Sequence, residues 1–201
     1  MAVALSEPVA RKMLHQREIT LRGYEREDGL FDIEAHLVDT KTYGFPSEDR
    51  GFIGPGEPLH GMWMRMTVDD HLTITACEAS TEYAPYTVCP QAAPNFARLA
   101  GLRIGKGFLK GAAERIGGAQ GCTHLRELLQ QMATVAFQTL YPVRRRREQE
   151  EAARRENEGA KLDSQIIANF GGAPALLNTC LAYGPDSPVV KRRWPHLYTG
   201  N

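Results

Sequence analysis

The chain has 201 residues, of which 42% are hydrophobic and 24% are charged, a composition typical of a protein that folds around a hydrophobic core. Lys plus Arg and Asp plus Glu both total 24, so net charge provides no general attraction to nucleic acid or to an anionic membrane. Because no segment resembles a signal peptide or a membrane span, and the four cysteines are scattered, we expect a cytoplasmic protein with reduced thiols.

Alternation of apolar and polar residues predicts β-strands in the first half of the chain. Residues 17–24 and 30–41 alternate with a period of two, residues 60–68 do so most regularly, and a turn leads to a further strand at 72–79. The segment 43–58 is rich in Gly and Pro and is expected to be a loop. Successive strands joined by turns predict an antiparallel meander.

The second half has helical periodicity. Short helices are expected at 95–102 and 107–116, followed by a long amphipathic helix from Cys122 to Tyr141. We expect Pro142 to interrupt this helix and the charged stretch 144–161 to form a solvated helix. Strands followed by helices predict an α+β fold, with the helices packed on one face of the sheet.

The predicted elements divide the chain into two parts. Residues 1–142 would form an α+β domain that carries a metal site. Residues 143–201 would form the charged helix and an ordered tail, which is too apolar to be disordered and is expected to pack back on the core.

The tetrapeptide Gly121-Cys122-Thr123-His124 precedes the long helix and is the first candidate for chemistry. Free N–H groups and the positive end of the helix dipole at such a position stabilise a thiolate. The alternative is that Cys122 simply packs, because it borders the apolar stripe of the helix.

Two further candidate metal ligands lie upstream of Cys122. His60 shares the inward face of its strand by parity, so it is either a core histidine or a ligand at the rim of the sheet. Cys89 lies on a proline-bounded loop between the sheet and the helices, where a lone cysteine is often incidental. If His60, Cys89 and Cys122 come together, their nitrogen and sulfur ligands suit zinc or iron.

Several side chains are candidates for proton transfer beside such a site. His124 points away from the apolar stripe of its helix, which favours a proton-transfer role over a ligand role. Glu82, on the connection from sheet to helices, is the candidate acid. Asp32 and Glu34 share the polar face of one strand, where two carboxylates either bind a metal or are simply solvated.

Residues 56–69 resemble the first ligand strand of the NifU/IscU-like iron–sulfur scaffold proteins. His60 takes the position of that family's first cysteine and Met62 that of an aspartate, while Cys89 and Cys122 match its second and third cysteines. The resemblance implies a sheet with helices on one face and a metal-capable rim. Two cysteines with one or two histidines would suit zinc or mononuclear iron as well as a cluster.

The whole chain also resembles a bacterial family of uncharacterised proteins, domain of unknown function family 2889, which implies no particular activity. The residues that carry this resemblance are Arg26, Asp28 to Glu34, Asp39 to Lys41, His60, Ala84 to Tyr86, Cys89, Gly121 to His124 and Asn178 to Cys180.

Together these features favour a metal-binding protein, a small zinc- or iron-dependent enzyme that acts on a small molecule. His60, Cys89 and Cys122 would hold the metal, with His124 and Glu82 as catalytic groups. The alternatives are a metal or iron–sulfur cluster carrier, a metal-free transferase that uses Cys122, and a partner-binding module. A small-molecule substrate or a protein partner is expected, with a homodimer possible and no role for nucleic acid or membrane.

Overall fold

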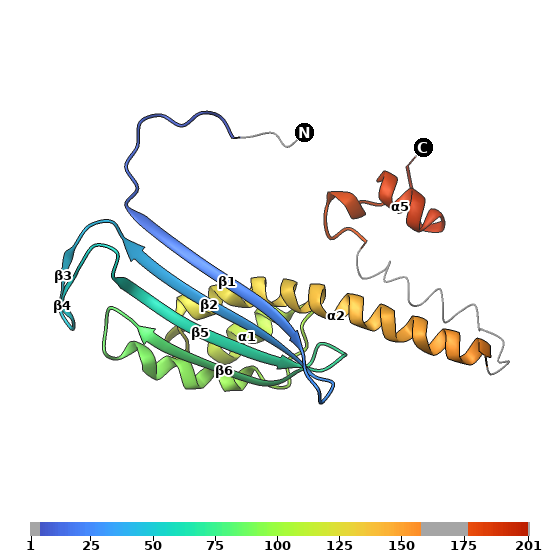
Figure 1. Ribbon diagram of the computed structural model, residues 1–201, viewed down its shortest axis with the longest axis horizontal. Helices are drawn as coiled ribbons and strands as arrows, with labels where there is room; N and C mark the ends of the chain where they lie inside the picture. The colour runs from blue at the N-terminus through green and yellow to red at the C-terminus, as the bar shows by residue number, and fades with distance from the viewer. Residues whose placement is uncertain (1–4, 158–176, 201) are drawn as a thin grey trace. The chain divides into compact units, whose positions relative to one another are not determined.

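The computed structural model describes residues 5–157 and 177–200 of the chain (Figure 1). The chain divides into two compact units, Met1–Arg144 and Arg145–Asn201. The first unit carries the sheet and the helices that contact it. Among the described residues, no helix combines the length and the hydrophobicity needed to cross a membrane.

A four-stranded antiparallel sheet forms one layer of the first unit. Its strands are β1 (His15–Glu25), β2 (Phe31–Lys41), β5 (Pro58–Val68) and β6 (Ile74–Tyr83), in the spatial order β1-β2-β5-β6. Each strand pairs in antiparallel fashion with the next strand of the sheet. The antiparallel meander predicted from the alternation is therefore confirmed.

The connection between β2 and β5 is more regular than predicted. β3 (Phe45–Ser47) and β4 (Gly51–Ile53) form a separate two-stranded hairpin within residues 43–58. The prediction of a simple loop there was wrong, because each strand has only three residues and is too short to show alternation.

Helices cover one face of the sheet, as Figure 1 shows, and the α+β fold class is confirmed. They are the 3-10 helix η1 (Cys89–Leu99), α1 (Phe108–Ile116), the short η2 (Gly118–Gln120) and the first part of α2 (Thr123–Asn157), which belongs to the first unit up to Arg144. α2 continues through Pro142, contrary to the expected interruption. Pro142 and Gln138 are both exposed, so water can bind the Gln138 carbonyl that would otherwise accept the missing N–H.

The hydrophobic core lies between the inward face of the sheet and the helices. Its fully buried side chains include Phe31, Ile33, Leu37, Met62, Met64, Met66, Phe96, Ile116, Leu125, Leu128 and Met132. β1 approaches α2 closely at Gly23, where a Cβ atom would lie 1.9 Å from Thr139 Oγ1. The core therefore holds the start of α2 against the sheet.

The second unit contains η3 (Leu181–Tyr183), α5 (Pro188–Arg193) and η4 (Pro195–Leu197). Val190 and Trp194 form a small buried cluster against Tyr183 and Tyr198. The predicted tail therefore has regular structure between residues 177 and 200. The parts of the predicted charged helix and tail at residues 158–176 lie outside the described residues, and the packing of the tail on the core stays a prediction.

Candidate metal centre

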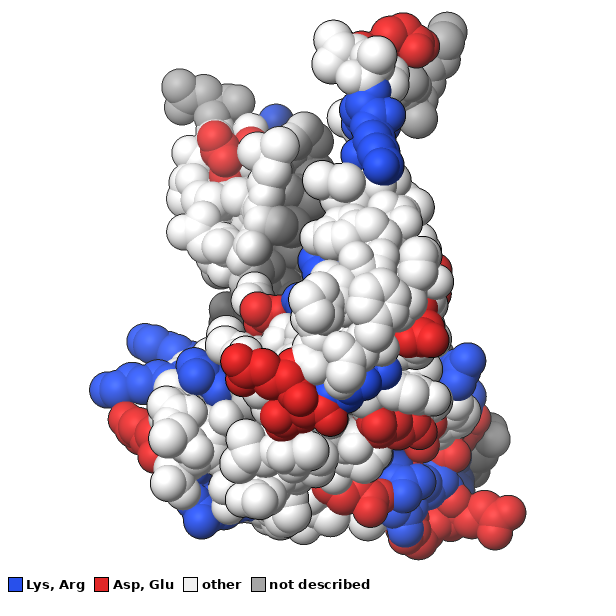
Figure 2. All heavy atoms as spheres, turned by 90° about the vertical axis from the view of Figure 1, so that its left-hand side faces the viewer, with Lys and Arg blue, Asp and Glu red and all other residues white. Residues whose placement is uncertain are grey.

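The predicted site residues gather at one end of the four-stranded sheet. β2 and β6 end there, and β5 begins there. Figure 2 views the molecule from that end and shows acidic and basic side chains interspersed on its surface. His60 lies near the start of β5 and pairs with Asp39 near the end of β2. Because both residues continue the inward faces of their strands, their side chains meet on the helix side of the sheet.

Asp39 is the most buried charged residue of this end, with only 1% of its surface exposed. Its carboxylate accepts two hydrogen bonds of 2.8 Å from Arg17, through Nε and Nη2, and lies 2.9 Å from His60 Nδ1 and 3.3 Å from His15 Nε2. Burial acts to raise the pKa of Asp39, but the hydrogen bonds and charge of Arg17 outweigh it and hold this pKa below its ordinary value. Asp39 is therefore a carboxylate with a fixed orientation.

The two histidines face each other beside this carboxylate. The ring centroids of His60 and His124 lie 3.8 Å apart at an interplanar angle of 35°, and His124 Nε2 lies 4.0 Å from Asp39 Oδ2. Burial, and next the proximity of His124, lower the pKa of His60 despite its bond to Asp39. His60 therefore favours its neutral form, the form in which imidazole binds metals.

Cys122 stands at the N-terminus of α2, where its carbonyl accepts the first helical hydrogen bond from Arg126. Its Sγ lies 3.9 Å from His124 Nδ1 and 3.8 Å from Met62 Sδ. The preceding Gly121 has a steric reason to be glycine, since a Cβ atom would lie 2.1 Å from the Ile116 carbonyl oxygen. This close approach fixes where α2 begins, and hence where Cys122 and His124 lie.

A cavity of about 520 Å³ brings together four predicted residues: His60, Cys89, Cys122 and His124. We call it the His/Cys cavity. Its other lining residues are Met62, Pro85, Tyr86, Val88, Gln91, Ala92, Asn95, Ala119, Gly121 and Thr123, none of which carries a formal charge. Asp49, in the turn between β3 and β4, accepts hydrogen bonds from the backbone N–H and hydroxyl of Thr87. The hairpin thereby holds the wall formed by Tyr86 and Val88.

Glu82 is exposed on β6 and is not among the residues that line the His/Cys cavity. Within the described residues, no hydrogen bond or ion pair joins this predicted catalytic acid to the other site residues. Its proposed role rests on the sequence alone.

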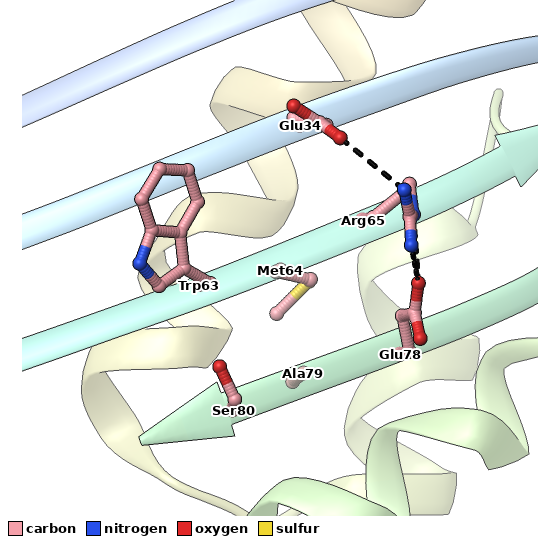
Figure 3. A pocket seen from close by; sticks show the side chains of 7 residues that line it. All are labelled: Glu34, Trp63, Met64, Arg65, Glu78, Ala79 and Ser80. Carbon is pink, nitrogen blue, oxygen red and sulfur yellow. Dashed lines mark hydrogen bonds and ion pairs between the residues drawn. The ribbon is translucent and has the colours of Figure 1, made fainter. Parts of the chain in front are cut away.

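Asp32 and Glu34 lie on the opposite face of the sheet. Asp32 accepts a hydrogen bond from Thr67, and Glu34 lies 3.5 Å from Arg65, which also pairs with Glu78. Figure 3 shows the contacts of Arg65 with Glu34 and Glu78, beside Trp63, in a separate cavity of about 260 Å³. Asp32 and Glu34 therefore belong to an ion-paired outer face and not to the His/Cys cavity.

Two residues of the centre, Asp39 and Arg17, were not among the predicted site residues. Asp39 had a usable signal, because it continues the odd-numbered inward face of Phe31, Ile33 and Leu37. Arg17 had no such signal in the sequence, because its contact with Asp39 depends on the register between β1 and β2.

The pKa shifts predict that the metal-free protein loses stability in acid in two steps. The pKa of His60 is lower in the folded chain than its ordinary value of 6.5. Neutral His60 therefore stabilises the fold above pH 6.5, and this stabilisation is lost as the pH falls from 6.5 through the folded pKa. The contribution of Asp39 is present above its ordinary value of 3.8 and is lost as the pH falls through its lowered folded pKa. Urea unfolding in chelator between pH 7.5 and 5, for wild type and His60→Gln, tests the first step. A wild-type midpoint that falls no more steeply than that of the variant would contradict it.

Comparisons with known proteins add a family but no function. A family model described as "Protein of unknown function (DUF2889)" matches residues 15–138, which leaves Asn178 to Cys180 outside the match. No match was found among curated proteins or solved structures, and the resemblance to NifU/IscU-like proteins stays a prediction.

Proposed function

We propose that this chain, which belongs to the DUF2889 family, is a metal-binding protein whose His/Cys cavity holds zinc or iron. One observation carries the proposal. Nitrogen and sulfur donors from β5, the start of η1 and the start of α2 line a single cavity, with a buried carboxylate bonded to the innermost donor.

The donor set fits such a metal. His60 is joined through Nδ1 to Asp39, which leaves Nε2 as the ligand atom. A carboxylate behind a metal-binding histidine fixes its tautomer and orientation and raises its basicity. His124 lies in one group of ligand atoms with His60, and Cys122 and Cys89 line the same cavity and would be further ligands of the type that zinc and iron accept. The ligand atoms of Asp39, His60 and His124 lie within 4.8 Å of one another, so Asp39 would act either as a third ligand of this group or, behind His60, as the group that orients the ring.

We further propose a small-molecule substrate. The His/Cys cavity is large enough for one and is lined by apolar and uncharged polar side chains around the donors. A bound zinc or iron ion would supply Lewis acidity there. His124, 4.0 Å from Asp39 Oδ2, is the group placed to hold or move a proton if it is not itself a ligand.

The test is elemental analysis of protein purified without chelator or affinity nickel. The proposal predicts about one zinc or iron ion per chain, and much less in Cys122→Ser. Labile iron accompanied by sulfide would instead indicate a cluster carrier. A metal-free protein that fails to take up added zinc would overturn the proposal.

A second function rests on a different observation, the arrangement of the Cys122, His124 and Asp39 side chains in a row. Cys122 Sγ lies 3.9 Å from His124 Nδ1, and His124 Nε2 lies 4.0 Å from Asp39 Oδ2, which places a thiol, a base and an orienting carboxylate in sequence. In an acyl transfer, Sγ would attack a carbonyl carbon, and its proton would pass through His124 to the leaving group. The resulting thioester would then be cleaved by water or another acyl acceptor.

This second function predicts rapid alkylation of Cys122 by iodoacetamide at neutral pH in metal-free protein. Cys77 is the internal control, because it is 6% exposed and burial raises its pKa to about 12. Mass spectrometry of the peptides measures both rates, and His124→Ala should slow the reaction of Cys122. If Cys122 reacts no faster than Cys77, the nucleophile function is wrong.

A further inference from the structure

β1 is an edge strand of the sheet, and it is long and regular. It spans 11 residues, contains no proline, and pairs with β2 without a register shift. Nine of its residues are exposed, and only Ile19 and Leu21 are half-buried. A long, regular edge of this kind is a template for pairing with another strand.

The backbone of β1 shows which residues face that open edge. Just outside the strand, the Leu14 carbonyl accepts from Thr42 N and Arg26 N donates to the Leu30 carbonyl. Alternate residues of an antiparallel strand face the same neighbour, so the even-numbered residues bond to β2. The N–H and C=O groups of Arg17, Ile19 and Leu21 therefore point away from β2.

We propose that this edge pairs with β1 of a second copy of the chain, antiparallel and centred on Thr20, to form a two-fold symmetric dimer. In this register the odd-numbered residues of one β1 lie opposite odd-numbered residues of the other. Their N–H and C=O groups, which point away from β2, can then bond to each other. Ile19 meets Leu21 of the second copy on the inward face. Two half-buried apolar residues that already contact the core are thereby covered.

Charge complementarity selects this register. Centred on Thr20, each Glu18 lies opposite Arg22 of the other copy, so symmetry creates two ion pairs. Glu18 and Arg22 are both exposed, and neither makes an ion pair among the described residues. A dimer centred on Ile19 would place Glu18 opposite Thr20, and one centred on Leu21 would place it opposite Tyr24.

Charge exchange tests the register. Sedimentation velocity of the full chain should give twice the mass of one chain. Glu18→Arg or Arg22→Glu alone replaces both ion pairs by like-charge contacts and should weaken the dimer at least about tenfold. The combined Glu18→Arg/Arg22→Glu variant should restore it. A monomeric wild type, a single exchange without effect, or a combined variant that stays monomeric would each overturn the proposal.

Cross-linking tests the centre of the interface. Two Thr20 residues directly opposite each other in a non-hydrogen-bonded pair have Cα atoms about 4.5 Å apart, within reach of a disulfide. Thr20→Cys should therefore form a covalent dimer through position 20 under mild oxidation. The matched control Arg22→Cys faces Glu18 and should not cross-link above the wild-type background. Equal cross-linking of the two variants would contradict the register.

Discussion

Replacing Asp39 with alanine is expected to lower the free energy of unfolding by about 3 kcal/mol, the largest stability effect we predict for a single residue. The substitution removes a carboxylate that is 1% exposed, and with it the partner of Arg17 and of His60 Nδ1. Breaking this pair is costly because Arg17, which is only 30% exposed, loses two hydrogen bonds and keeps only Glu127, while His60 Nδ1 loses its partner. Urea unfolding at neutral pH in chelator measures the loss.

The matched control for this experiment is Asp28→Ala. Asp28 also pairs with an arginine, Arg26, but its side chain is 51% exposed. Exposed ion pairs contribute little, so the control should leave the urea midpoint nearly unchanged. Equal losses in the two variants would show that Asp39 is not the buried anchor of this site.

Replacing His60 with alanine is expected to lower zinc affinity about 100-fold or more, because it removes the one donor held by a buried carboxylate. Asp39→Asn should lower zinc affinity about 10- to 100-fold, since it leaves the ligand in place but loses the charge behind it. Competition with a chromophoric chelator measures both affinities.

His36→Ala provides the control for His60→Ala. His36 stacks on Trp63 at a centroid distance of 3.9 Å and belongs to the outer face of the sheet, away from the His/Cys cavity. Its removal should leave zinc affinity unchanged. If both histidine variants lose zinc equally, general destabilisation explains the loss and His60 is not a specific ligand.

Much of this architecture follows from local sequence patterns. Alternation located β2 and β5 and placed His60 on the inward face, and the apolar stripe with Gly121-Cys122 located the start of α2. The structure then places His60, Cys89, Cys122 and His124 in one cavity, although they come from three separate segments.

What local patterns could not provide are the contacts that depend on strand register and tertiary packing. Arg17 reaches Asp39 because β1 pairs with β2 at this exact register. The close contact between the tilted rings of His124 and His60 depends on how α2 packs under the sheet. The three-residue strands of the β3–β4 hairpin are too short for periodicity to reveal. Each of these features depends on residues far apart in the sequence or is too short to show a hydrophobic periodicity.

X-ray absorption spectroscopy at the zinc edge of the zinc-loaded chain tests the central claim most directly. If His60 and Cys122 bind the metal, the first shell must contain sulfur at about 2.3 Å together with nitrogen at about 2.0 Å. The sulfur contribution should decrease in Cys122→Ser and the imidazole scattering should decrease in His60→Ala. A first shell of light atoms alone, unchanged in either variant, would contradict a metal site in the His/Cys cavity.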